Sequence, residues 1–116
     1  MQHDDLVYVG QMLDMARKAR QAVEGKDRAA FDADEILRVA LTHWVQVIGE
    51  AARRVSAEYQ ATHPNVPWTA IIGMRHKVVH DYMAVDEDVV WQTVQEDLPE
   101  LIELLEAIVP PEQPEA

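Results

Sequence analysis

The segment DEILRVALTHWVQVIGEAARRV, residues 34–55, decides the fold class of this sequence. Its apolar residues fall on nearly every side of a helical wheel, and the strict alternation typical of strands is absent. We therefore predict a central, largely buried helix here. One polar stripe interrupts its apolar surface, at spacings of four, four and three residues: Thr42, Gln46, Glu50 and Arg53. Such a stripe is either a solvated face or, on so apolar a helix, the lining of a cleft or the partner of a buried charge.

Helical periodicity also fills the sequence upstream of this segment. Apolar residues recur at helical spacing from about residue 5 to residue 24, Leu6 among them, and Gly25 is a suitable stop. Residues 26–34 are predicted to be a link that offers two aspartate caps for the central helix. The first half of the chain is therefore expected to form two long helices joined by a short connection.

Downstream, proline and capping residues mark the predicted boundaries. Ser56 can cap a short helix that ends before Pro64, because the residue preceding proline disfavours helical backbone. Pro67 suits the first turn of a helix from about residue 68 to 81. Asp86 can cap a last helix, which reaches about residue 109. Pro99 is expected to kink or split this last helix. The sequence thus predicts one all-α domain, residues 1–109, as a bundle of four main helices, followed by a disordered acidic tail, residues 110–116.

Composition narrows the functional classes. The 116 residues contain no cysteine, which excludes disulfides and thiolate chemistry, and the acidic N-terminus and lack of a membrane-length apolar run predict a soluble, cytoplasmic protein. A net charge of -11 argues against a general nucleic-acid coat protein, and no DNA or membrane partner is expected. Residues 51–80 nevertheless carry a local net charge of +3, from Arg53, Arg54, Arg75 and Lys77 against Glu58. This uneven distribution indicates a focused anion site, with chance clustering as the alternative.

The one concentrated patch of chemistry is RHKVVHDY, residues 75–82. On a helical wheel Arg75 lies in the middle of an apolar face, where a cation is costly unless it is paired or lines a cleft. His76, His80 and Tyr82 fall with it on one arc of roughly 160°, if the helix persists that far. Arginine suits phosphate, and a histidine near neutral pKa suits proton transfer. The set predicts metal-free cleavage of RNA, in which a histidine deprotonates the ribose 2′-OH and Arg75 stabilises the charge that develops on phosphorus oxygens.

Two other readings of this patch stay open. In a purely structural one, Arg75 pairs with Glu50 inside the bundle, His80 caps a helix end and Tyr82 is a core residue. In the other, His76 and His80 have the spacing of a zinc-binding helix, but the glutamate of H-E-x-x-H is missing and no third ligand is evident. We therefore expect neither a metal nor another cofactor.

The segment resembles the signature of the HEPN superfamily (higher eukaryotes and prokaryotes nucleotide-binding), Arg-x4-His-x-Tyr, and within it the HepT-like toxins of bacterial toxin–antitoxin pairs. Arg75, His80 and Tyr82 match the signature itself. Its flanks match in order: Ile48-Gly49-Glu50-Ala51-Ala52-Arg53-Arg54, Pro67-Trp68, Ile71-Ile72-Gly73-Met74-Arg75, Val85-Asp86, Val90-Trp91 and Leu98-Pro99-Glu100-Leu101. The resemblance covers residues 3 to 108.

This resemblance implies an antiparallel bundle of four to five helices that forms a two-fold dimer, with both signature helices facing one cleft. It implies a metal-independent endoribonuclease toxin that leaves a 2′,3′-cyclic phosphate, with Arg75 and His80 as catalytic residues. It also implies a nucleotidyltransferase antitoxin of the MNT type, which can transfer nucleotide to Tyr82. The superfamily often has asparagine after the arginine, where this chain has His76, so we assign His76 a supporting role beside Glu50 and Arg53.

A second class of function is a catalytically idle HEPN domain that binds nucleotide or serves as the partner subunit of a nucleotidyltransferase. Retention of Arg75, His80 and Tyr82 favours the enzyme, because an idle copy has no chemical need for all three.

Overall fold

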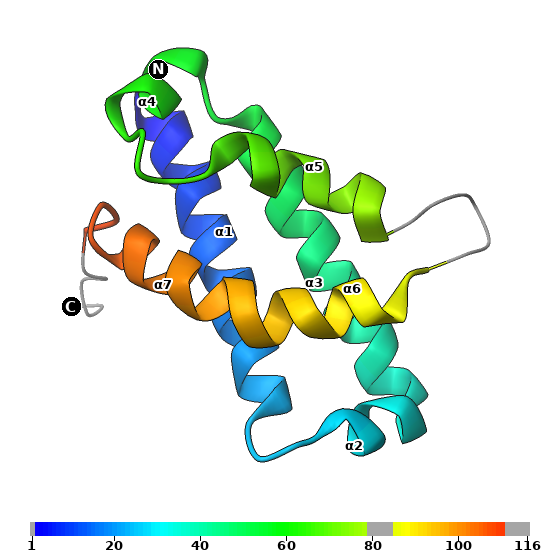
Figure 1. The fold of residues 1–116 in the computed structure, drawn as a ribbon. Coiled ribbons are helices and arrows are strands. Elements are labelled where there is room, and N and C mark those ends of the chain that lie inside the picture. The colour runs from blue at the N-terminus through cyan, green and yellow to red at the C-terminus, as the bar shows by residue number, and fades with distance from the viewer. Residues whose placement is uncertain (1, 79–84, 111–116) are drawn as a thin grey trace.

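The computed structural model describes residues 2–78 and 85–110, except for the side chains of Gln2, His3 and Arg75. Within those ranges the chain forms helices joined by short turns, without a strand, so the predicted all-α class is confirmed. Figure 1 shows the bundle, in which the C-terminal helices cross the first two long helices.

The first long helix, α1 (Gln2–Val23), lies beside the second, α3 (Glu35–Arg54) (Figure 1). α1 ends where the sequence predicts, since Gly25 has a φ of +75°, a left-handed conformation that glycine adopts without strain. Leu6, expected in the buried stripe, is instead 37% exposed. The stripe that α1 does bury consists of Val9, Met12, Leu13, Ala16, Ala19 and Val23.

The link between α1 and α3 is not simply a connection, as the sequence suggested, but contains the short helix α2 (Arg28–Ala33). Each of its two aspartate caps serves a different helix. Asp27 accepts a hydrogen bond from the Ala30 N–H at 2.9 Å and begins α2, while Asp34 accepts one from the Leu37 N–H at 3.0 Å and begins α3. Fully buried Phe31 anchors α2 to the core.

The central helix α3 has the predicted length but not the predicted burial. Its core-facing side holds Leu37, Leu41, Val45, Ile48, Gly49, Ala51 and Ala52. Ile36 and Val39, however, are 82% and 64% exposed, so the expectation of a helix enclosed on nearly all sides is wrong. α3 packs against both α1 and α5, and among the described residues an apolar strip of Ile36 and Val39 stays open near its start.

Ser56 caps the start of the short helix α4 (Ala57–Thr62), as predicted. The Ser56 hydroxyl accepts a hydrogen bond from the Tyr59 N–H at 3.1 Å. Asp5 of α1 accepts hydrogen bonds at 2.8 Å from both the Ser56 N–H and the Ser56 hydroxyl. Asp5 is only 5% exposed, and the Ser56 N–H bond holds the pKa of its carboxyl below the usual value. This pair fastens the start of α1 to the end of α3.

After Pro67 the chain forms α5 (Trp68–Val78), which starts at the predicted residue. The helix was predicted to continue to residue 81, but residues 79–81 lie outside the described part of the chain. The Ile71 N–H donates to the Pro67 carbonyl at 3.0 Å, and the Trp68 indole N–H donates to the His63 carbonyl at 3.0 Å. α5 packs along α3 (Figure 1).

The predicted last helix consists of three parts: α6 (Glu87–Gln92), the π-helical turn η1 (Thr93–Asp97) and α7 (Leu98–Glu106). Within η1 the Leu98 N–H donates to the Thr93 carbonyl, five residues back. The Val94 carbonyl would accept next from residue 99, but Pro99 has no N–H. The Arg20 guanidinium of α1 supplies a donor instead, 3.2 Å from the Val94 carbonyl oxygen. The predicted split near Pro99 is therefore confirmed, and a distant arginine satisfies the carbonyl it leaves.

The three tryptophans belong to the core or to its edge. Trp68 is buried, and Trp44 and Trp91 pack against the core from its edge. In the described part of the chain, no helix combines the length and the apolar character needed to cross a bilayer. The predicted disordered tail, residues 110–116, lies outside the described residues from 111 onward.

Candidate functional site

α5 carries the first residues of the predicted site. Ile71 and Val78 are buried and Ile72 is partly buried, which confirms that this side of α5 packs into the bundle. The backbone of Arg75 belongs to α5, and His76 beside it is exposed. The Arg75 side chain lies outside the described part of the structure, as do all atoms of His80 and Tyr82.

The two ends of the interval 79–84 meet at one point of the bundle. The Asp86 N–H donates to the Val78 carbonyl at 2.6 Å, so the last residue of α5 is bonded to the residue before α6. Asp86 also begins α6 as predicted, because its carboxylate accepts from the Val89 N–H at 3.2 Å. The start of α6 is thereby fixed to the end of α5.

Half of the polar stripe on α3 lines a hollow at this point. Thr42 and Gln46 share a hollow of about 440 Å³ with Val39 and with Val85, the residue that precedes the α6 cap. The prediction that the stripe lines a cleft is confirmed for these two residues. The hollow therefore includes the residue at which the described chain resumes after residue 84.

The other half of the stripe is an ion-pair cluster. Glu50 accepts from Arg53 at 2.6 and 3.3 Å and from Arg54 at 3.2 Å. The bond from Arg53 is the main reason that the pKa of Glu50 falls to about 2. Glu50 lies one residue before the basic segment 51–80. Its negative charge therefore neutralises part of the excess positive charge of that segment. The predicted supporting residues Glu50 and Arg53 are thus adjacent, at the surface.

The zinc reading finds no further support among the described residues, where no three histidine, aspartate or glutamate side chains gather as a metal site would require. His76 is exposed, and its proposed co-ligand His80 lies outside the described residues. The structural reading, in which Arg75 pairs with Glu50, involves a side chain that is likewise outside them.

Comparison with known proteins places this arrangement in a family. The family model described as "Ribonuclease HepT-like" matches residues 12–108, which include α3, α5, the polar stripe and the whole Arg75–Tyr82 segment. The chain belongs to the HepT-like ribonuclease family. The signature resemblance, which also places it in the HEPN superfamily, is thereby confirmed.

Individual HepT-like relatives agree. A "Putative RNase" of Caldanaerobacter subterraneus subsp. tengcongensis is 32% identical over 93 residues, 80% of this chain and 83% of that protein. A "Putative RNase" of Methanocaldococcus jannaschii is 27% identical over 90% of this chain and 96% of its own length. The "Probable ribonuclease HepT" of Thermococcus cleftensis is 37% identical over 61% of this chain and 64% of that protein. No solved structure was found to match.

Sequence reasoning missed several polar groups of this HepT-like chain. Arg38 pairs with Glu87 at 3.1 Å, and both residues line the hollow that Thr42 and Gln46 share with Val85. Thr93 and Asp97 of η1 face a second cavity on another side of α5. For Thr93 and Asp97 the sequence did contain one signal. Pro99 has no backbone N–H and therefore disturbs the helix just before it.

Proposed function

We propose that this chain is a metal-independent endoribonuclease in which Arg75 and His80 act on the scissile phosphodiester. The observation that carries the proposal is the intact Arg75-x4-His80-x-Tyr82 motif in a member of the HepT-like family. The naming of its relatives as ribonucleases supports the same reaction class. RNA is accordingly the substrate.

The reaction that these residue types suit is attack by the neighbouring 2′-OH. His80 takes the proton from the 2′-OH, the oxygen bonds to phosphorus, and the bond to the 5′-oxygen breaks as that oxygen takes up a proton. The products are a 2′,3′-cyclic phosphate and a free 5′-OH. Arg75 stabilises the negative charge on the non-bridging oxygens, and His76, Glu50 and Arg53 have supporting roles near the substrate strand.

A two-fold dimer would place two copies of the motif at one cleft. The open apolar strip supports a partner surface, since Ile36 and Val39 on α3 and Val85 before α6 are 82%, 64% and 41% exposed. Exposed apolar side chains that gather in this way are typical of surfaces that associate. Val39 and Val85 line one hollow, and Val85 follows Tyr82 by three residues in the sequence, so we expect a dimer formed here to bring the two motifs together.

We further propose that the chain is the toxin of a toxin–antitoxin pair and that its antitoxin is a nucleotidyltransferase of the MNT type. Transfer of a nucleoside monophosphate to the Tyr82 hydroxyl would place an anion near Arg75, where it competes with substrate phosphate. Residues 1–109 would form the functional domain, and the toxin would act in the cytoplasm.

Replacing the two catalytic candidates tests the proposal. Arg75→Ala and His80→Ala should each lower the rate of RNA cleavage by roughly a hundredfold or more, as is typical when a charge stabiliser or general base is removed. Arg17→Ala is the matched control, because Arg17 pairs with Glu106 on the surface of α1, away from the motif. Parental cleavage by either variant, with circular dichroism confirming its fold, would disprove the role assigned to that residue.

A further inference from the structure

The C-terminal end of α3 carries two arginines and one glutamate, which we call the Glu50 cluster: Glu50, Arg53 and Arg54. Arg53 donates to both carboxylate oxygens of Glu50, at 2.6 and 3.3 Å. Arg54 donates to one of them through Nε alone, at 3.2 Å. The two arginine side chains stay 55% and 54% exposed. Two guanidinium groups therefore face solvent around a single carboxylate.

This cluster has an excess of positive charge in an acidic protein. Arg17, Arg28 and Arg38 each pair with at least one carboxylate that no other described arginine contacts. At Glu50 two arginines share one acid, so the three side chains sum to +1, whereas the whole chain carries -11. The helix dipole favours basic residues at a helix C-terminus, but it does not require that two of them share one partner. The cluster therefore has the charge of an anion site.

The two guanidinium groups are held in place before any ligand binds. Arg53 is oriented by its two bonds to Glu50. The Tyr8 hydroxyl of α1 and the Glu50 carboxylate both raise the pKa of Arg54, because each accepts from the charged group. Donors that are oriented in advance lose less conformational entropy when an anion binds. Arginine also matches the geometry of phosphate, to which it can donate two N–H groups at once.

The Glu50 cluster lies on the same polar face of α3 as the hollow that Gln46 shares with Val85. On a helical wheel Gln46, Glu50 and Arg53 fall within roughly 60° of one another. Arg53 follows Gln46 by seven residues, which is roughly 10 Å along the helix axis. α5, whose backbone includes Arg75, packs along the same helix (Figure 1). A strand bound along this face of α3 would therefore cross the Glu50 cluster.

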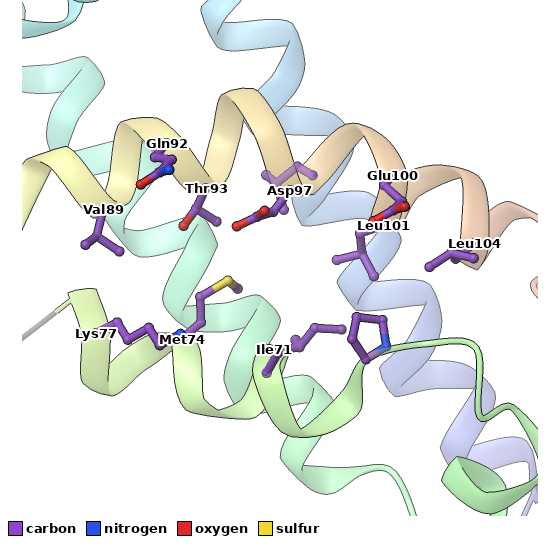
Figure 2. A pocket seen from close by; sticks show the side chains of 13 residues that line it. Ile71, Met74, Lys77, Val89, Gln92, Thr93, Asp97, Glu100, Leu101 and Leu104 are labelled. Carbon is purple, nitrogen blue, oxygen red and sulfur yellow. The ribbon is translucent and has the colours of Figure 1, made fainter.

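Lys77 does not add to this positive surface. Figure 2 shows it on the side of α5 that faces η1 and α7, where Asp97 and Glu100 line the same cavity. Burial raises the pKa of Asp97, and the nearby charge of Lys77 counteracts that rise. Lys77 is thus directed toward acids. Among the described lysine and arginine side chains of residues 51–80, those of the Glu50 cluster are left to bind an anion.

We propose that Arg53 and Arg54 together bind a phosphodiester of the RNA that flanks the cleaved one, with Glu50 as the residue that positions both guanidinium groups. This inference rests on the proposed ribonuclease function, which supplies the polyanionic ligand. The bonds to Glu50 use Nε and one Nη of Arg53 and only Nε of Arg54. The remaining Nη groups donate to the non-bridging phosphate oxygens. The subsite strengthens binding and aligns the strand, and it takes no part in proton transfer.

A single-stranded 2′-O-methyl oligonucleotide tests the subsite without turnover, because it lacks the attacking 2′-OH. Fluorescence anisotropy between about 50 and 200 mM salt gives its affinity and the salt dependence of that affinity. Arg54→Gln should weaken binding about fivefold at the lower salt concentration and reduce the slope of log K against log salt by about 0.7, the value for one phosphate contact on a single strand. Arg54→Lys should keep the parental slope, because it keeps the charge. Arg17→Gln is the matched control, since it removes one exposed arginine from an ion pair on α1 and should keep the parental affinity and slope.

Three results would overturn the proposal. The first is the absence of oligonucleotide binding by the parent protein, and the second is a parental salt slope in Arg54→Gln. The third is an equal loss in Arg54→Gln and Arg17→Gln, which would reduce the effect to the change in net charge. Failure of the proposed function is a separate result. Binding that depends on Arg54 in a protein that cuts no RNA would refute the nuclease and leave the subsite, whereas RNA cleavage with a parental slope in Arg54→Gln would refute only the subsite.

Discussion

Replacement of Arg20 tests how the π-helical turn is held. The Arg20 guanidinium donates to the Val94 carbonyl at 3.2 Å and to the Gln95 side-chain oxygen at 2.6 Å, in a partly buried setting. Arg20→Met keeps the apolar stem but removes both bonds and leaves the Val94 carbonyl without a donor. Such a loss costs about 1–3 kcal/mol. We expect the free energy of unfolding to fall by about 2 kcal/mol and the melting temperature by about 8 °C.

A double-mutant cycle with Pro99→Ala isolates the cause. Alanine restores an N–H at position 99, which can donate to the Val94 carbonyl, so Arg20→Met should cost about 1 kcal/mol less in that background. Urea unfolding followed by circular dichroism measures all four proteins. The control is Arg17→Met, which breaks an exposed ion pair on the same helix and should cost less than about 1 kcal/mol. Equal costs of Arg20→Met in both backgrounds would refute the assigned role.

Three further predictions follow from the described contacts and the proposed function. Because Ser56 lowers the pKa of Asp5, the Asp5 carboxylate should stabilise the fold fully above its unfolded pKa near 3.8, and this contribution should be lost as pH falls through the lower folded pKa. The difference in unfolding free energy between the parent and Asp5→Asn, measured by urea unfolding, should therefore shrink below about pH 4. A difference that stays constant with pH would contradict this. Ile36→Lys with Val39→Lys should shift sedimentation from a dimer to a monomer of 13.2 kDa, whereas a dimer that persists would exclude this surface as the interface. Co-expression with the neighbouring nucleotidyltransferase should add nucleotide mass to the peptide that contains Tyr82 and not to Tyr82→Phe, and an unmodified but inhibited protein would indicate occlusion instead.

Local chemistry made much of the fold predictable. Asp34, Ser56 and Asp86 each satisfy a free N–H of the helix that follows, an interaction within three residues that the sequence displays directly. Gly25 and Pro67 mark a helix end and a helix start for backbone reasons that are equally local. These boundaries agree with the structure, whereas the start of α2 at Asp27, which is equally local, was missed.

Features that depend on tertiary partners were not predictable in this way. Periodicity shows that α3 is apolar on many sides but not which side has a neighbour, so the exposure of Ile36 and Val39 was not foreseen. The π-helical turn needs Arg20, which lies more than seventy residues away along the chain. The hollow lined by Thr42 and Gln46 likewise depends on how Val85 comes to lie beside α3, which no local pattern encodes. The motif residues were proposed from chemistry that is read in the sequence, whereas the cavity that Thr93 and Asp97 line required the fold.

Attack by the 2′-OH is tested most directly by cleavage of RNA by the purified protein in EDTA, with a matched RNA that carries a single 2′-deoxy substitution at the cleaved position. We predict cleavage of the first RNA with a 2′,3′-cyclic phosphate on the product, no cleavage at the substituted position, and no cleavage by His80→Ala. Cutting at the 2′-deoxy position, or equal cutting by His80→Ala, would contradict the proposed attack by the 2′-OH with His80 as its base.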